Sequence, residues 1–464
     1  MAGSRYDLVV IGAGAAGSTA ASKAAEMGVR IAMVESDKLG GTCLNYGCDP
    51  TKTLLSIAKH LHIARHPERY GLRIPTAEAD WAAVTERVQS VIEKIRGGPY
   101  EKAWAETQRK GIDLFAGEAS FISPHELSVL GQIISADRVI IATGVEARGL
   151  DVEGLEEVGY ITNHEAVSLR TLPERLAIVG GGPVGVEFAQ MFSRFGVDVV
   201  VLQRGPSLLP NEDVELAEML CHMLAAEGIQ METLADLCCV PGPGEGKRLL
   251  VRHGEHEDEY VVDEILVAVG RRPQISKLNL EAAGVRVEDE RLVLDNTLRT
   301  TVPHIWAAGD VTGGNQFTHI ASEQGEFAVR NAFASEPEPF DMPVVPRVTF
   351  TDPELAHVGQ TEAQLRKENI SYRIARMPLN KLDRAIAEAE TDGMVKMLAG
   401  DKGEILGCHI LAPGAGDLIS LIVVAMKAGL TVDALAETVL PYPTMAEAVR
   451  WAADMLKNGR VPGK

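Results

Sequence analysis

The stretch "YDLVVIGAGAAGSTAASKAAEMGVRIAMVES", residues 6–36, joins two apolar runs through the motif G-x-G-x-x-G at Gly12, Gly14 and Gly17. An apolar strand before the glycines and a helix after them form the context in which this motif binds a dinucleotide. The glycines let the backbone approach a pyrophosphate, which lies at the N-terminus of the following helix. The segment therefore predicts a parallel α/β nucleotide-binding fold.

The pattern returns 168 residues later (Gly12 to Gly180), in "ERLAIVGGGPVGVEFAQMFSRFGVDVVVLQR". Gly180, Gly182 and Gly185 take the places of the first three glycines. The alternative is that both segments are glycine-rich turns that bind no ligand. Each copy, however, lies between a strand and a helix, which is the context that dinucleotide binding requires. We therefore predict two dinucleotide sites.

The last residue of the second apolar run distinguishes the two sites. Glu35 ends the first run and can accept hydrogen bonds from a ribose diol, so it favours FAD at the first site. Gln203 stands at the equivalent place in the second copy and is followed by Arg204. The second site thus lacks the carboxylate that would repel a 2′-phosphate, and it has an arginine that could bind one. Both differences favour NADPH over NADH at the second site. The alternative for Arg204 is a solvated loop residue.

Length and charge limit the remaining possibilities. The chain has 464 residues and a formal charge of −20, which indicates about three domains and argues against a nucleic-acid or anionic-membrane partner. The N-terminus lacks the pattern of a signal peptide, and the most apolar stretch, 418–430, is too short to cross a bilayer. We expect a cytoplasmic protein, in which closely spaced cysteines are catalytic or metal-binding rather than structural.

Such a cysteine pair occurs in "GGTCLNYGCDPTK", residues 40–52. A regular helix advances about 7.5 Å over five residues, beyond the roughly 6.8 Å that a disulfide spans between Cα atoms. A bridge between Cys43 and Cys48 therefore needs a distorted turn, which Gly47 can provide, and a strained bridge is easily reduced. Pro50 suits the first turn of a helix, so Cys48 should lie at a helix N-terminus that favours its thiolate. A plain disulfide or a zinc pair remains the alternative.

The whole chain resembles the FAD-dependent pyridine nucleotide–disulfide oxidoreductases, which include dihydrolipoamide dehydrogenase, glutathione reductase and mercuric reductase. The resemblance rests on both glycine motifs, the cysteine motif, and "ATG", "AVGRRP", "AAGD" and "FTDPELAHVG", all in the order of the family. It implies an α/β fold with two Rossmann-like dinucleotide-binding domains, for FAD and NAD(P), and a C-terminal α+β dimerisation domain. The expected boundaries are 1–150 for the FAD domain, 151–275 for the NAD(P) domain, 276–345 for the return to the FAD domain, and 346–464 for the interface domain.

The resemblance also implies roles for single residues. Cys48 would accept electrons from the flavin while Cys43 faces the substrate. Lys52 would lie beside the flavin, paired with Glu187 of the second glycine motif's helix. No resident metal site is implied. The further cofactor-binding residues are Thr42, Lys52, Gly117, Thr143, Gly144, Asp310 and Thr318 for FAD, and Gly270 for NAD(P).

The C-terminal motif departs from the family's pattern. Disulfide reductases carry His-Pro-Thr there, with a glutamate that follows; this chain has "PYPTMAE", 441–447, with Tyr442 at the histidine position and Glu447 retained. In the family this motif completes the active site of the other subunit, so we expect a homodimer with shared sites. We also expect a cis Tyr442–Pro443 bond that turns the ring toward the partner subunit's cysteines, with Glu447 behind the hydroxyl.

This substitution bears on the electron acceptor. Histidine titrates near neutrality and suits proton transfer to a leaving thiol, whereas a free tyrosine does not. Mercuric reductases also carry tyrosine here, because two thiolates take a soft cation directly. They end in a cysteine pair, which this chain lacks. We expect electrons to pass from NADPH through FAD to the cysteine pair and on to a metal ion or another small electrophile. A dihydrolipoamide dehydrogenase-like reductase and a flavin-bound redox sensor without turnover are the alternatives.

Overall fold

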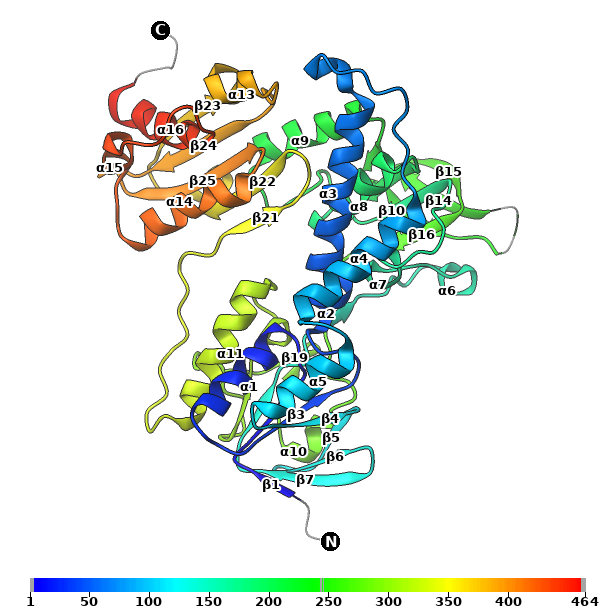
Figure 1. The fold of residues 1–464 in the computed structure, drawn as a ribbon, viewed down its shortest axis with the longest axis vertical. Coiled ribbons are helices and arrows are strands. Elements are labelled where there is room, and N and C mark those ends of the chain that lie inside the picture. The colour runs from blue at the N-terminus through cyan, green and yellow to red at the C-terminus, as the bar shows by residue number, and fades with distance from the viewer. Residues whose placement is uncertain (1–3, 243, 245, 460–464) are drawn as a thin grey trace.

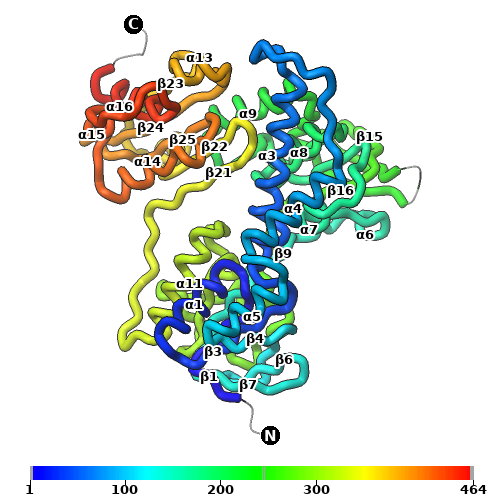
Figure 2. The backbone as a smooth tube through the Cα atoms, viewed as in Figure 1, coloured from blue at the N-terminus to red at the C-terminus, as the bar shows by residue number. Residues whose placement is uncertain are grey.

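The computed structural model describes residues 4–242, 244 and 246–459 and shows the mixed α/β architecture that the sequence predicts. Figure 1 shows three lobes: one at the bottom that contains α1 (Ala15–Glu26) and α11 (Thr318–Phe333), one on the right around α8 (Pro183–Arg194), and one at the top left around α14 (Ala415–Lys427) and α16 (Ala446–Asn458). The extended segment 334–346 runs between the bottom and top-left lobes, as the yellow part of the tube shows (Figure 2).

The bottom lobe is built on a five-stranded parallel sheet in the order β20-β8-β2-β3-β4. Alternate residues of β2 enter different cores: Val10 packs with α1 and α11, and Val9 packs against a second sheet, β1-β7-β6-β5. The strands are buried on both faces, as parallel sheets require. The bounds are β1 Ser4–Tyr6, β2 Leu8–Ile11, α1 Ala15–Glu26, β3 Ile31–Glu35, β4 Ile112–Ala116, β5 Ala119–Ser123, β6 Glu126–Val129, β7 Gln132–Ala136, β8 Val139–Ile141, β20 Ile305–Ala307 and α11 Thr318–Phe333.

The right-hand lobe repeats this design with a parallel sheet in the order β12-β11-β10-β16, and an antiparallel sheet, β13-β14-β15, packs beside it. Its bounds are α6 Leu155–Val158, α7 Asn163–Ala166, β10 Arg175–Val179, α8 Pro183–Arg194, β11 Asp198–Gln203, α9 Val214–Ala226, β12 Gln230–Thr233, β13 Asp236–Cys239, β14 Lys247–His253, β15 His256–Val262 and β16 Glu264–Val267.

The C-terminal lobe is a five-stranded antiparallel sheet in the order β21-β22-β25-β24-β23. Apolar faces of α14, α15 and α16 share one core with this sheet. Its bounds are β21 Arg347–Thr349, β22 Glu354–Gly359, α12 Glu362–Lys367, β23 Arg373–Pro378, α13 Asp383–Ala387, β24 Met394–Ala399, β25 Ile405–Ala412, α14 Ala415–Lys427, α15 Val432–Glu437 and α16 Ala446–Asn458. The exact domain boundaries given above remain a prediction.

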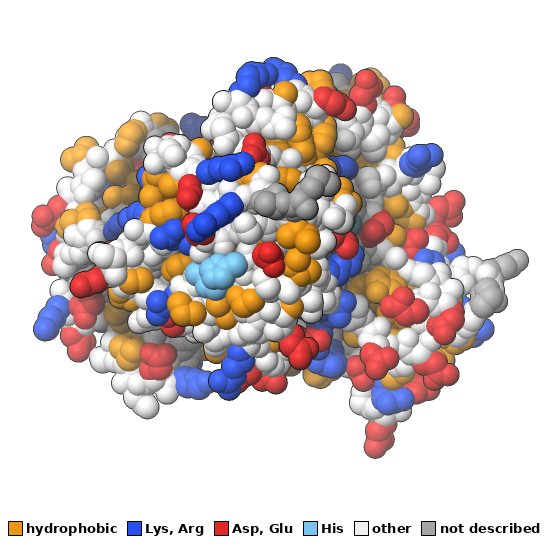
Figure 3. All heavy atoms as spheres, turned by 90° about the horizontal axis from the view of Figure 1, so that it is seen from below, with side chains coloured by type: hydrophobic (Ala, Val, Ile, Leu, Met, Phe, Trp, Pro, Cys, Tyr) orange, Lys and Arg blue, Asp and Glu red, His pale blue; other side chains and the backbone are white. Residues whose placement is uncertain are grey.

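The other helices and strands lie in the bottom lobe or between lobes. They are α2 Gly41–Tyr46, α3 Cys48–Arg65, α4 Trp81–Arg96, α5 Tyr100–Arg109, β9 Val145–Ala147, β17 Arg271–Pro273, α10 Leu280–Ala283, β18 Val287–Glu288 and β19 Arg291–Leu292. Three short 3-10 helices, Pro67–Tyr70, Asp310–Thr312 and Leu379–Lys381, complete the structure of the described residues. Seen from below, acidic, basic and hydrophobic side chains are intermingled on the surface (Figure 3). Within the described residues, no helix is both long and apolar enough to cross a membrane.

The two glycine motifs make the same close contacts. A Cβ on Gly12 would lie 2.3 Å from the carbonyl oxygen of Ala142, and one on Gly180 would lie 2.4 Å from that of Ala268. Both glycines have positive φ, 106° and 113°. The third glycines of the motifs, Gly17 and Gly185, also have no room for a side chain. A Cβ on either one would lie 1.9 Å from the carbonyl oxygen of the first glycine of the same motif. The motifs therefore set strand–helix packing in both lobes.

We predict that Gly185→Ala destabilises the right-hand lobe, because the new methyl group meets a backbone carbonyl that cannot move aside. Overpacking of this kind costs about 1–3 kcal/mol. Gly182→Ala is the matched control, since nothing lies within 4 Å of its Cβ position. Thermal unfolding should show a lower apparent Tm for Gly185→Ala alone. Equal Tm values for the two variants would contradict this account of the packing.

Candidate active site

The cysteine motif spans two helices rather than one. Helix α2 ends at Tyr46 and α3 begins at Cys48, with Gly47 between them at φ −128° and ψ −109°. A Cβ on Gly47 would lie 3.0 Å from the carbonyl oxygen of Thr42. The helix is thus interrupted where the spacing of the cysteines requires it, and Cys48 lies at a helix N-terminus.

Both cysteines are half-buried free thiols that meet the same hydroxyl group. Thr318, the first residue of α11, donates to Cys43 Sγ at 3.1 Å, and its Oγ1 lies 3.4 Å from Cys48 Sγ. Hydrogen bonding from Cys43, with smaller help from Thr318 and Lys52, lowers the pKa of Cys48 to about 6 against the effect of burial. The same hydrogen bond and burial raise the pKa of Cys43. These groups therefore favour the thiolate on Cys48 over that on Cys43.

One ion pair joins the redox helix to two other parts of the fold. Lys52 Nζ donates to Glu187 Oε2 at 2.8 Å, and Glu187 Oε1 accepts from the backbone N–H of Phe350 at 2.8 Å. Lys52 Nζ also lies 4.4 Å from the centre of the Phe350 ring. Glu187 is a buried residue of α8, the helix of the second nucleotide motif, and Phe350 belongs to the C-terminal lobe. These contacts therefore connect α3 with both parts of the fold.

A second charged residue, Asp49, lies in the first turn of α3. It is half-buried, and burial raises the pKa of its carboxyl group, opposed by the charge of Lys52. Its negative charge in turn raises the pKa of both thiols. Among the described residues, none makes a hydrogen bond to this carboxylate.

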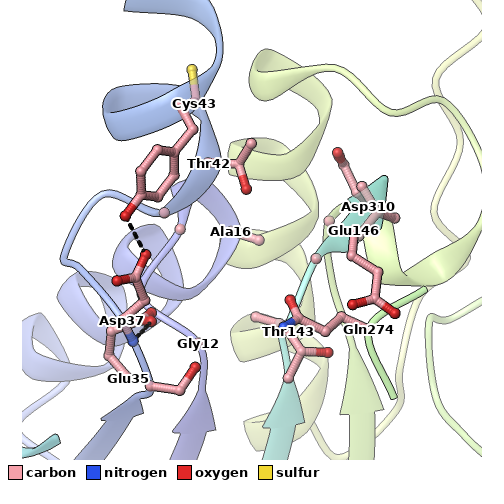
Figure 4. A pocket seen from close by; sticks show the side chains of 18 of the residues that line it. Gly12, Ala16, Glu35, Asp37, Thr42, Cys43, Thr143, Glu146, Gln274 and Asp310 are labelled. Atoms are coloured by element: carbon pink, nitrogen blue, oxygen red, sulfur yellow. Dashed lines mark hydrogen bonds between the residues drawn. The ribbon is translucent and has the colours of Figure 1, made fainter. Parts of the chain in front are cut away.

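A cavity of about 500 Å³ has Cys43 among its lining residues, whereas Cys48 and Lys52 do not line it. Glu35 and Asp37 lie on one side of it and Thr143 and Gln274 on the other, and Cys43 in the first turn of α2 also lines it (Figure 4). The predicted FAD-binding residues that line it are Gly12, Gly14, Glu35, Thr42, Gly117, Thr143, Gly144, Asp310 and Thr318. Gly17 faces the carbonyl of Gly12 instead and acts through packing.

The lining suits a flavin dinucleotide. The hydroxyl oxygen of Thr143 is buried and has no hydrogen-bond partner among the described residues, although it lines the cavity. Within the part of the chain that the structure describes, the carboxylate of Asp310 forms only a long ion pair, with 3.9 Å between Oδ2 and Arg271 Nη1. Burial raises the pKa of this carboxyl group. A ligand rich in hydroxyl and phosphate groups would satisfy such atoms, and Gly14, whose Cβ position has only Gly41 Cα within 4 Å, leaves room for a pyrophosphate.

Glu35 and Gln203 have a second role that the sequence did not reveal. Glu35 Oε2 accepts from the N–H of Ala13 at 2.7 Å, and Gln203 Oε1 accepts from the N–H of Gly181, the equivalent residue, at 2.9 Å. Each side chain thus holds its own glycine turn in place. Arg204 is exposed beside the second turn, and Gly182 and Gly270 have open space at their Cβ positions.

The C-terminal motif is far from the cysteines within one chain, since α16 and α2 lie in different lobes (Figure 1). The Tyr442–Pro443 bond is cis, as predicted. The tyrosine ring is 71% exposed, and its hydroxyl donates to Asp383 Oδ2 at 2.8 Å. Glu447 Oε2 accepts from the N–H of Thr444 at 3.3 Å. Asp383 and, with a smaller effect, the charge of Glu447 raise the pKa of Tyr442, so the place of Glu447 behind the hydroxyl stays a prediction.

Sequence reasoning missed several residues of the site. Arg271 and Gln274 line the cavity because β17 pairs with β9. The motif "AVGRRP", which contains Arg271 and directly precedes Gln274, could have pointed to both residues. Asp383 lies 59 positions before Tyr442, so no local pattern connects the two. Tyr46 Oη donates to Asp37 Oδ2 at 2.7 Å, and both residues line the cavity.

Two nucleotide-binding modules with a thiol pair beside the first cavity define a nucleotide-dependent redox protein. The chain belongs to the pyridine nucleotide-disulphide oxidoreductases: it matches that family over residues 6–325 and the family's dimerisation domain over 345–453. FAD and a pyridine nucleotide are the family's cofactors, and its members use a redox-active disulfide.

Relatives that are named for different substrates have similar sequence identities to this chain. A mercuric reductase of Streptomyces lividans is 36% identical over 457 residues, which cover 97% of this chain and 96% of the relative. A dihydrolipoyl dehydrogenase of Chlamydia muridarum is 34% identical, with coverage of 97% and 96%. The HOCl-induced flavoprotein disulfide reductase RclA from Escherichia coli has a similar structure, with a TM-score of 0.87, 30% identity, and coverage of 97% of this chain and 100% of RclA. RclA has also been solved as a Cu(II) complex, at 31% identity, a TM-score of 0.85 and coverage of 95% and 98%.

We predict that Cys43→Ala raises the pKa of Cys48 from about 6 toward the ordinary value of a thiol, because it removes the main hydrogen bond to the thiolate. Cys43→Ser keeps a donor and should raise it less. A charge-transfer band between the Cys48 thiolate and oxidised flavin reports this titration. The absence of a band at alkaline pH in both variants would contradict the assignment of Cys48 as the flavin-facing cysteine.

Proposed function

We propose that this protein is an NADPH-dependent flavoenzyme that passes electrons through the Cys43–Cys48 pair to a soft metal ion or another small electrophile. The observation that carries the proposal is Tyr442 in the position where disulfide reductases of the family have histidine. Its hydroxyl is held by Asp383, and this carboxylate raises the pKa of the tyrosine. Tyr442 therefore keeps its proton at neutral pH and is a poor base for thiol–disulfide exchange.

FAD in the cavity supplies two-electron transfer between the nicotinamide and the thiol pair. The protein's own residues hold the pair ready for it. Thr318 fixes both sulfur atoms, and Lys52 favours the thiolate of Cys48. The ion pair of Lys52 with Glu187 keeps the second nucleotide module against the redox helix. Cys43 is then the thiol that meets the acceptor.

We also propose that the active enzyme is a homodimer in which Tyr442 faces Cys43 of the partner subunit. The match to the dimerisation family and the exposure of the tyrosine support this arrangement. Apolar side chains exposed on and near α14 give such an interface its hydrophobic part, because exposed apolar groups gain by burial between subunits. They are Leu421, Val424, Leu430 and Val439.

A metal acceptor fits the chemistry of this site. Two thiolates bind a soft cation directly, so no leaving thiol has to be protonated. The mercuric reductases among the relatives, and the Cu(II) complex of RclA, support this choice. The dihydrolipoyl dehydrogenases at nearly the same identity support a second candidate, a lipoamide-type reductase.

We predict that the purified holoenzyme oxidises NADPH with Hg(II) or Cu(II) faster than with lipoamide or oxidised glutathione. Tyr442→His supplies a group that titrates near neutrality and should raise the disulfide activities, while Tyr442→Phe should slow metal reduction. Initial rates with each acceptor test both variants. Lipoamide turnover by the unaltered enzyme on the order of 100 s⁻¹ would favour the second candidate.

We predict that Arg204→Ala raises the KM for NADPH by about 10- to 150-fold, the equivalent of one charge-assisted hydrogen bond worth roughly 1.5–3 kcal/mol. The KM for NADH should change little, because NADH has no 2′-phosphate. Arg170→Ala, an exposed arginine outside the glycine motif, is the control. Equal effects on both coenzymes would show that Arg204 does not bind the phosphate.

A further inference from the structure

Two aromatic rings from different parts of the fold stack in the lining of the FAD cavity. Tyr46, the last residue of α2, lies against His164 of α7, with 3.6 Å between the ring centroids and 22° between the ring planes. Both residues line the cavity. Tyr46 belongs to the cysteine motif, and α7 belongs to the right-hand lobe. The stack therefore joins the redox motif to the second nucleotide-binding lobe at the cavity wall.

Hydrogen bonds connect Tyr46 to the residue that we expect at the FAD ribose. Tyr46 Oη donates to Asp37 Oδ2 at 2.7 Å, and the N–H of Asp37 donates to Glu35 Oε1 at 2.8 Å. Lys38 Nζ lies 4.9 Å from the centre of the Tyr46 ring. Asp37 and Lys38 also line the cavity. The tyrosine ring is thus held at the end of the cavity where Glu35 lies.

The segment that carries His164 is anchored in its own lobe. The backbone of Ile161 pairs with β16, the edge strand of the parallel sheet in that lobe. Asn163 Nδ2 donates to the carbonyl oxygen of Tyr46 at 2.9 Å, so the segment contacts both the backbone and the ring of Tyr46. Residues 162–165 all line the cavity. The segment therefore extends from the right-hand sheet to the wall of the FAD cavity.

The electron transfer proposed above uses neither ring. Tyr46 is half-buried and His164 is more exposed, so the stack reaches the protein surface. Burial raises the pKa of Tyr46, with help from Asp37, and partial burial lowers the pKa of His164. Both rings are therefore uncharged at neutral pH, and stacked aromatic rings attract each other beyond what their buried area contributes. The cost of separating the rings is then a cost of opening the cavity.

We propose that the stacked rings of Tyr46 and His164 form a latch that retains FAD, with residues 162–165 closing one side of the cavity. The rings separate when FAD enters or leaves, and no covalent bond changes. The inference concerns the cofactor and goes beyond the proposed function, because it holds for any electron acceptor.

The test uses the FAD-loaded enzyme and measures the rate of FAD release by the rise of flavin fluorescence on dilution. His164→Leu and Tyr46→Leu each remove one ring, the double variant removes both, and His164→Phe keeps an aromatic ring. His304→Leu is the matched control. It breaks the stack of His304 on His125, with 3.8 Å between the centroids, and neither of these residues lines the FAD cavity. The apparent Tm of each variant checks that it folds.

We expect His164→Leu to speed FAD release roughly 2- to 10-fold, the effect of losing one aromatic pair. Tyr46→Leu should have at least this effect, because it also removes the hydrogen bond to Asp37. The double variant should release FAD no faster than Tyr46→Leu, since His164 acts through the tyrosine ring. His164→Phe should keep the slow release, and His304→Leu should leave the rate unchanged.

Several results would overturn the latch. Unchanged FAD release in His164→Leu, or release from His164→Phe as fast as from His164→Leu, would show that the stack does not retain the cofactor. Additive effects of the two leucine substitutions would show that the rings act separately. A rate in His304→Leu as high as in His164→Leu would show a general loosening of the FAD lobe. If the unaltered enzyme reduces no metal ion but His164→Leu releases FAD faster as expected, the proposed function fails and the latch stands.

Discussion

The buried contact of Lys52 with Glu187 is the constraint on which the arrangement of the molecule depends. One carboxylate receives the redox helix through an ammonium group and the C-terminal lobe through the N–H of Phe350, while its own helix carries the second glycine motif. Loss of either partner would leave the buried Glu187 carboxylate without that contact, which is costly for a charge taken out of water. Arg194, Glu227, Asp352 and Lys59 form a second such cluster between the same elements.

The pKa of Cys48 is set by groups with opposite effects. The hydrogen bonds from Cys43 and Thr318 and the charge of Lys52 favour the thiolate of Cys48, whereas burial and Asp49 disfavour it. The balance favours the thiolate on Cys48 over that on Cys43 when the pair is reduced. The hydroxyl of Thr318 serves both sulfurs because α11 begins beside the break at Gly47.

Much of this could be read from local patterns. Gly12 and Gly180 occupy positive φ against a neighbouring carbonyl, a requirement that only glycine meets without strain, so the two modules were recognisable from spacing alone. The five-residue spacing of Cys43 and Cys48 likewise predicted an interrupted helix, because helix geometry is set by the rise per residue. Asp383 was not predictable, since its contact with Tyr442 arises from the packing of α13 beside the C-terminal motif.

The sequence by itself determined the two nucleotide modules, the thiol pair and the family, because glycine conformation, apolar periodicity and residue spacing are local properties. Only the tertiary structure decided that the hydroxyl of Thr318 from α11 contacts both sulfur atoms of the pair, and that Asp383 accepts the hydrogen bond of the tyrosine. Hydrogen bonds and charges act over a few ångströms in space. Residues separated by 59 to 275 positions come that close only through the packing of whole helices and sheets.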